Sequence, residues 1–223
     1  MKRTMKRQWA TAAAVSMLSL CGTANAHEAG NVLLRTGPTW VLPNDDSSTV
    51  KPIPGSGVEV GDGISLGFSV TYLLTPQIGV ELLAALPFEH DIKGEGSLDG
   101  VDIGSIKHLP PTVTLQWYPE LGVDWVQPYV GAGINYTTFF DEDADGELES
   151  IVGKTKISLD DSWGYALELG ADWRVSDRWF INTSLWYVDI ATDATLKTAG
   201  AGTLKTEVDI NPLVLMVGVG TRF

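Results

Sequence analysis

The sequence predicts an all-β fold, an eight-stranded antiparallel transmembrane β-barrel with long extracellular loops and short periplasmic turns. Three observations support this fold. Residues 208–223 alternate between large apolar and mostly small side chains with the period of two that strands have. The chain ends on Phe223, and barrels of the Gram-negative outer membrane typically end on a strand with such an aromatic residue. Other segments alternate in the same way, and long and short connections separate them in turn.

The first three predicted strands are the most regular ones. Residues 32–40 alternate, with Pro38 as a defect, and the Pro-, Gly- and Asp-rich residues 44–62 are typical of a long loop. Residues 63–74 give the clearest strand, because every even position is apolar. A short turn with a central proline then leads into a strand over residues 78–89, which makes a hairpin.

The fourth strand follows a second long loop, the Gly- and Asp-rich residues 90–104. Its start is irregular because Pro110 and Pro111 donate no backbone hydrogen bonds, so we expect an interrupted ladder there. Alternation becomes regular over residues 112–117.

The last four predicted strands again alternate with period two, and they are residues 126–138, 164–173, 179–187 and 208–223. Short turns at 119–124 and 175–178 and long loops at 141–156 and 191–205 connect them. The first of these loops is strongly acidic, and the second is rich in Gly, Ala and Thr.

The order of the connections predicts the architecture. Long loops alternate with short turns, so the turns share one end with both termini, as in eight-stranded outer-membrane barrels. We therefore predict the outer membrane of a Gram-negative bacterium, with its lipid and lipopolysaccharide as partners, and binding of the barrel-assembly machinery to the strand ending at Phe223. The alternative, a soluble β-sandwich, would need a polar outward face. The aromatic residues expected in two interfacial girdles are Trp40, Tyr72, Trp117, Tyr136, Trp173, Trp179, Tyr187 and Phe223.

Residues 1–26 are predicted to be a secretory signal peptide that is removed before His27, which leaves residues 27–223 as the barrel. Basic residues precede an uncharged run, and residues 24–26 (ANA) form a small-x-small cleavage site. The run is too short for a spanning helix, which needs about 20 apolar residues. A lipoprotein signal at Cys21 is the alternative, but the preceding Leu20 is larger than such signals normally have there.

The mature chain is strongly acidic and has no cysteine. Removal of the four basic leader residues from 15 leaves 11 Lys and Arg against 28 Asp and Glu, a net charge of −17. This charge excludes nucleic acid as a partner. Since Cys21 lies in the leader, no disulfide stabilises the fold, and the hydrogen bonds of a closed barrel must do so.

Five stretches resemble the outer-membrane protein W (OmpW) family. They are residues 27–30 (HEAG), 78–85 (IGVELLAA), 108–112 (HLPPT), 128–140 (PYVGAGINYTTFF) and 161–164 (DSWG). The resemblance covers essentially the whole mature chain, and the long loops depart most from it. It implies an eight-stranded barrel that passes small, mostly hydrophobic molecules; relatives include alkane uptake proteins and a channel proposed for small amino acids.

The resemblance also implies that Leu83 and Trp163 constrict the lumen. Alternation places Trp163 on the lipid side, so either a bulge at Gly164 turns the indole inward or the gate role is wrong here. The residues that alternation directs into the lumen include Leu83, Trp186, Val214 and Met216, beside acids such as Glu81 and Glu168. An apolar lumen suits a hydrophobic solute better than ions or sugars, although each residue singly can be simple core packing.

Prolines on two neighbouring strands predict an opening in the barrel wall. Pro87, Pro110 and Pro111 fall on the facing upper halves of the third and fourth strands, where they interrupt hydrogen bonding. The predicted function is therefore passive uptake of small hydrophobic molecules with lateral exit into the membrane. The alternatives are a channel for small amino acids and a structural or adhesive barrel, which would have a fully packed, charge-networked lumen.

Two further signals are weak. Asp141, Asp143 and Asp145 have the spacing of a calcium loop, but Val152 stands where a bidentate Glu is needed, and no flanking helix is expected; a solvated acidic loop that shares divalent ions with lipopolysaccharide is the alternative. His90 and His108 lie near the second loop without a Ser-centred motif, so we predict neither an enzyme nor a cofactor.

Overall fold

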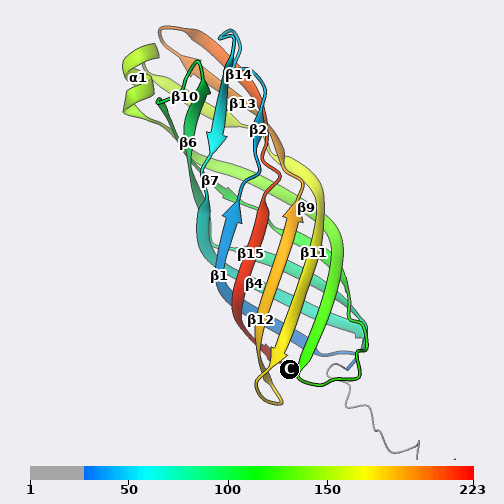
Figure 1. Ribbon diagram of the computed structural model, residues 1–223. Helices are drawn as coiled ribbons and strands as arrows, with labels where there is room; N and C mark the ends of the chain where they lie inside the picture. The colour runs from blue at the N-terminus through cyan, green and yellow to red at the C-terminus, as the bar shows by residue number, and fades with distance from the viewer. Residues whose placement is uncertain (1–27) are drawn as a thin grey trace, which may run out of the picture.

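The computed structural model describes residues 28–223, so the predicted leader, Cys21 and His27 lie outside the described residues. Eight antiparallel strands form a closed barrel (Figure 1). Each strand pairs with the next around the ring, and the last strand, β15, pairs with the first, β1. The predicted fold class is confirmed. The barrel strands, in their order around the wall, are β1 (Val32–Leu42), β4 (Gly63–Thr75), β5 (Ile78–Ala85), β8 (Thr112–Trp117), β9 (Val126–Ala144), β11 (Ser162–Arg174), β12 (Trp179–Val188) and β15 (Leu213–Arg222).

The long connections are themselves ordered and stand above one end of the barrel, opposite the C-terminus (Figure 1). We call this the loop end and the opposite one the turn end. A hairpin of β6 (Phe88–Gly96) and β7 (Asp102–Leu109) is flanked by β3 (Ser56–Val60). A separate sheet contains β2 (Asp46–Ser47), β10 (Thr155–Leu159), β13 (Ala191–Thr198) and β14 (Gly202–Asp209), and helix α1 (Gly146–Val152) lies beside β10.

Three sequence predictions about the connections were wrong. Residues 90–104 and 191–205 form hairpins rather than loops, because buried residues alternate along them beneath their Gly-, Asp- and Thr-rich composition. The last strand does not begin at residue 208, which belongs to β14. A break intervenes, because Asn211 has a positive φ of 39° and Pro212 donates no backbone hydrogen bond.

The outer wall is apolar, and the lumen is filled with side chains. On β4 the even positions face outward, as predicted; Ile64 is 62% exposed. Exposed and half-buried aromatic side chains gather at both ends of the strands. Trp173 packs on Trp125 near the turn end, with ring centroids 5.7 Å apart, and Tyr136 packs on Trp163 near the loop end, with centroids 4.7 Å apart. Among the described residues, no helix is long and apolar enough to cross a membrane.

Candidate functional site

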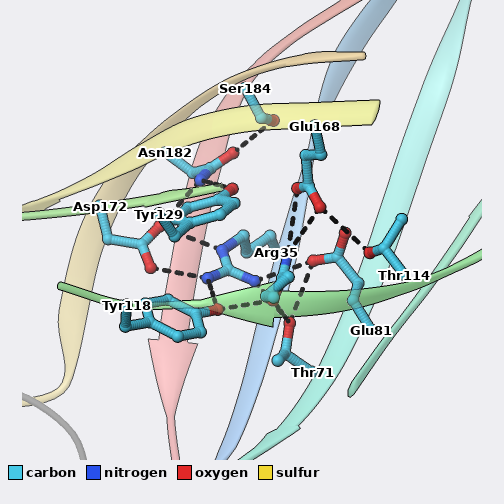
Figure 2. A network of polar contacts seen from close by, with 11 residues as sticks. Arg35, Thr71, Glu81, Thr114, Tyr118, Tyr129, Glu168, Asp172, Asn182 and Ser184 are labelled. Carbon is cyan, nitrogen blue, oxygen red and sulfur yellow. Dashed lines mark hydrogen bonds and ion pairs between the residues drawn. The ribbon is translucent and has the colours of Figure 1, made fainter. Parts of the chain in front are cut away.

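The lumen contains a buried arginine at the turn end. Arg35 points inward from β1, is fully buried, and uses all five of its N–H groups (Figure 2). Nε and Nη2 donate to the two carboxylate oxygens of Asp172, at 3.0 and 2.7 Å. Nη1 donates to Glu81 at 3.0 Å and to Thr71 at 2.7 Å, and Nη2 also donates to the Tyr118 hydroxyl at 3.2 Å. No donor of this buried cation is therefore left unsatisfied.

Further polar groups extend this network across the barrel. Gln116 donates to both oxygens of Glu168, at 3.0 and 2.9 Å, and Thr114 donates to Glu168 at 3.1 Å. Asn182 donates to Asp172 at 2.8 Å and to the Tyr129 hydroxyl at 2.9 Å (Figure 2). We call the whole set the polar layer; its members are Arg35, Thr71, Glu81, Thr114, Gln116, Tyr118, Tyr129, Glu168, Asp172, Asn182 and Ser184.

Aromatic rings and glycines complete the packing around the polar layer. The Arg35 guanidinium carbon lies 5.0 Å from the centre of the Tyr129 ring and 5.6 Å from that of Phe180. Each ring occupies space that an inward-facing glycine leaves open, since a Cβ on Gly170 would overlap Tyr129 and one on Gly220 would overlap Phe180. The layer draws residues from seven of the eight barrel strands or their ends, so the turn half of the lumen is filled.

The loop half of the lumen is mainly apolar. The strand register places Met216 and Ser184 one inward step above Asn182, and Trp186 and Val214 one step further. Above them lies a narrow, almost closed pocket with a free volume of about 20 Å³, which we call the upper pocket. Its lining residues are Thr39, Val41, Leu83, Ala84, Ala85, Phe88, His108, Pro110, Thr112, Val188, Ile190, Pro212 and Val214.

The barrel wall is interrupted beside the upper pocket. The ladder between β5 and β8 ends at the pair Leu83 and Thr112, and the β6–β7 ladder starts at the pair Phe88 and His108. Between these pairs, the described chain shows no pairing of residues 84–87 with residues 109–111; we call these two segments the wall gap. Residues from both segments line the upper pocket, so the pocket reaches the gap from inside.

Asn135 on β9 holds one edge of the wall gap in place. Its side-chain amide donates to the Pro110 carbonyl at 3.2 Å, to the Pro111 carbonyl at 3.4 Å and to the Thr112 hydroxyl at 2.9 Å. Thr137 in turn donates to the Asn135 amide oxygen at 2.7 Å. These side-chain bonds add to the backbone bond that the Tyr136 amide donates to the Pro111 carbonyl at 3.1 Å, so the proline segment is held to β9.

Most of the predicted path residues are in the lumen. Leu83 and Val214 line the upper pocket, while Trp186 and Met216 are fully buried between it and the polar layer. Trp163 is an exception, since its side chain is 72% exposed on the outer wall and contacts Tyr136. The lumen position implied by the resemblance is therefore wrong in this chain, because β11 keeps strict alternation through Gly164 and has no bulge there.

The predicted lateral prolines lie at the wall gap. Pro87 belongs to one of its segments, and Pro110 and Pro111 to the other; Pro87 and Pro111 face outward, and Pro110 lines the upper pocket. The interruption of the ladder at Pro110 and Pro111 is thus confirmed.

The three acidic candidates for calcium do not converge. Asp141 pairs with Lys107 at 3.3 Å, and Asp145 caps α1 by accepting a hydrogen bond from the Glu147 amide at 2.8 Å. Asp143 faces Ser105 across the β7–β9 ladder. Within residues 28–223, no group of three or more His, Cys, Asp or Glu side chains is placed to hold a metal ion. The expectation that no helix flanks this segment was wrong, because Asp145 starts α1.

The two histidines lie together above the barrel. His90 and His108 face each other from β6 and β7 with ring centroids 4.8 Å apart, and each is 1% exposed. Burial, and then the neighbouring His90, lower the pKa of His108 to about 3, and burial lowers the pKa of His90. Both rings are therefore neutral at neutral pH.

The sequence analysis missed Arg35 and Asn135. Arg35 had a signal, because it and Arg222 are the only Lys or Arg residues in the regularly alternating parts of the eight predicted strands, and Arg35 lies within its strand rather than at its last position. A lone inward cation among inward acids predicts an ion pair. Asn135 had no such signal, since its role depends on contacts with residues that are 23 to 25 positions away along the chain.

Comparison with known proteins gives one consistent result. The family model described as "OmpW family" matches residues 28–223. Outer membrane protein W of Vibrio cholerae is 44% identical over 200 residues, which are 89% of this chain and 91% of that protein. The crystal structure of OprG from Pseudomonas aeruginosa superimposes with a TM-score of 0.84 at 39% identity, covering 89% of this chain and 98% of that one. The dibenzothiophene metabolism operon protein PahQ of P. aeruginosa is 31% identical over 172 residues, 77% of both chains.

Proposed function

Because the chain belongs to the OmpW family and lies in the outer membrane of a Gram-negative bacterium, we propose that it takes up small hydrophobic molecules passively and releases them sideways into the membrane. The family is one of non-enzymatic outer-membrane proteins. The loop end is extracellular and the turn end periplasmic in this proposal, as in outer-membrane barrels generally.

One observation carries the proposal: a mainly apolar pocket reaches an unpaired stretch of wall, and the buried Trp186 and Met216 and then the filled, charged polar layer lie beneath it. A hydrophobic solute gains free energy when it leaves water for apolar surroundings such as the upper pocket, whereas passage through the polar layer would break the hydrogen bonds of Arg35. The wall gap leads instead to lipid, which is as apolar as the solute. The name of the relative PahQ, which places it in a dibenzothiophene metabolism operon, is consistent with a hydrophobic aromatic solute.

The alternatives have less support. A structural or adhesive barrel would be expected to pack its whole lumen like the polar layer, and the upper pocket departs from that expectation. A small amino acid carries two charges and would need polar partners along its route, but the upper pocket offers mainly hydrocarbon. Binding of lipopolysaccharide by the acidic segment and recognition of the C-terminal strand by the assembly machinery stay part of the proposal; Phe223 is 68% exposed at the turn end.

Uptake by liposomes that contain the protein tests the proposal. We expect alkanes and aromatic hydrocarbons to enter faster than in empty liposomes, and small amino acids to enter at the same rate. The variant with Pro110→Thr and Pro111→Val should restore strand pairing across the wall gap and lose the acceleration. Equal rates with and without the protein for all hydrophobic solutes would contradict the proposal, as would full activity in a folded double variant.

A further inference from the structure

The upper pocket is not uniformly apolar, because His108 is part of its lining. The ring is 1% exposed and stands between Phe88 and Phe139, whose ring centroids are 5.5 and 6.0 Å away in edge-on contacts. Among the described residues, neither ring nitrogen of His108 has a hydrogen-bond partner. A buried polar group without a partner costs stability, so it calls for a physical explanation.

The neighbouring His90 adds a third unpartnered nitrogen, and its hydrogen-bonding character is defined. Its Nδ1 lies 2.6 Å from the carbonyl oxygen of Gly61, so Nδ1 carries the proton and donates it to that oxygen. Nε2 of the neutral ring is then an acceptor, and within residues 28–223 it too has no partner. The His pair therefore presents an acceptor on His90 and one donor and one acceptor on His108.

We propose that the upper pocket selects hydrophobic molecules that carry one hydroxyl group, with His108 as the residue that binds this group. A hydroxyl is the smallest group that both donates and accepts, so it matches the nitrogens of a neutral imidazole. A carboxylate only accepts, and burying its charge among Val41, Leu83 and Val214 would be unfavourable. Since the pocket has a free volume of about 20 Å³, its lining side chains must move apart to admit any solute, and a pure hydrocarbon would then leave the nitrogens unpaired.

This inference rests on the proposed uptake function and specifies its substrate class as apolar alcohols and phenols. The Pro110 side of the wall gap and His108 line the same pocket, so a solute bound at His108 is already next to the exit. The hydroxyl selects the solute in the pocket, and the apolar body leaves through the gap toward lipid.

The test compares 2-naphthol with 2-methylnaphthalene, which have nearly the same shape and differ in a hydroxyl for a methyl group. Binding to the protein in lipid nanodiscs is measured by fluorescence, with partitioning into empty nanodiscs subtracted. We expect the wild type to prefer 2-naphthol by about tenfold after this correction, the gain of about one hydrogen bond. The same solute should shift the imidazole nitrogen resonances of His108, and 2-methylnaphthalene should not.

Three variants make the test specific. His108→Phe keeps an aromatic ring and should bind both solutes equally, whereas His108→Gln retains a donor and an acceptor and should keep the preference. Thr192→Val is the matched control, because Thr192 is a buried threonine of β13 outside the upper pocket, and its hydroxyl donates to the Asp160 carbonyl at 2.7 Å; it should leave the preference for 2-naphthol unchanged. Folding of each variant is checked by heat-dependent migration in gel electrophoresis.

The possible outcomes distinguish failure of the hydroxyl preference from failure of hydrophobic uptake. If wild type and His108→Phe bind both solutes with equal affinity, the hydroxyl preference is refuted while hydrophobic uptake stands. If neither solute binds beyond the lipid background, the uptake function itself fails. A preference that persists in His108→Phe would also overturn the role of this residue.

Discussion

Replacing Arg35 with methionine should destabilise the barrel strongly. Arg35→Met keeps most of the aliphatic stem but removes the guanidinium, and with it two bonds to Asp172, one to Glu81 and two to hydroxyl groups. Asp172 and Glu81 are 4% and 1% exposed, so their carboxylates would lose their cation without gaining water. Breaking a buried ion pair in this way costs about 3 to 5 kcal/mol.

The free energy of unfolding is measured by urea denaturation of the protein in lipid vesicles, followed by tryptophan fluorescence. Arg174→Met is the matched control, because Arg174 is part-exposed at the turn end, where it pairs with Asp177 at 2.8 Å; we expect it to cost about 0 to 1 kcal/mol. Adding Asp172→Asn and Glu81→Gln to Arg35→Met should recover much of the loss, since the unpaired charges are then gone. The reasoning is refuted if Arg35→Met costs no more than Arg174→Met.

Three further predictions concern the packing of the lumen, the wall gap and the histidines. Gly170→Ala forces the Tyr129 ring to move, so it should cost about 1 to 3 kcal/mol of unfolding free energy in the same assay. Asn135→Leu removes the hydrogen bonds to the Pro110 and Pro111 carbonyls and to the Thr112 hydroxyl. It should therefore lower the free energy of unfolding by about 1 to 3 kcal/mol and speed amide exchange along the edge of the gap. The lowered pKa of His108 means that opening of the β6–β7 hairpin takes up a proton, so local stability is lost as the pH falls from about 6.5 toward about 3. The loss is about 1.4 kcal/mol per pH unit, measured by hydrogen exchange corrected for intrinsic rates.

Each of these predictions has its own control. Gly146→Ala places a Cβ in open space and should have little effect on stability; an equal effect at Gly170 would contradict the packing argument. Wild-type exchange rates at the Leu109 and Thr112 amides in Asn135→Leu would show that this side chain does not hold the gap. His108→Phe should reduce the pH dependence of hairpin opening, and an unchanged slope would assign it to other groups.

Alternation was sufficient to predict the barrel, because every strand must divide its side chains between lipid and lumen. The same rule placed Trp163 outward, and the exposed side chain shows that alternation was a better guide than the matched family position. The ordered hairpins above the barrel could not be predicted from composition, because Gly and Asp indicate turns even where buried residues alternate, as they do in β6.

The contents of the lumen could be predicted only in part. The inward position of Arg35 follows from the strand, but its pairing with Asp172 joins residues 137 positions apart, and the barrel closure alone brings them together. Likewise, Pro110 and Pro111 predicted an interrupted ladder, while the bonds from Asn135 depend on the register between β8 and β9. Sequence patterns give the direction of a side chain, and the register decides its partners.

The most direct test of lateral release asks where a solute arrives first. Pyrene, which is almost insoluble in water, is delivered from cyclodextrin to vesicles that contain the protein, with a quencher either on the lipid acyl chains or trapped in the inner aqueous space. The account predicts that the protein accelerates quenching by the lipid quencher only, and that Pro110→Thr with Pro111→Val abolishes this acceleration. Faster quenching from the inner aqueous space, or acceleration that survives in the folded double variant, would contradict it.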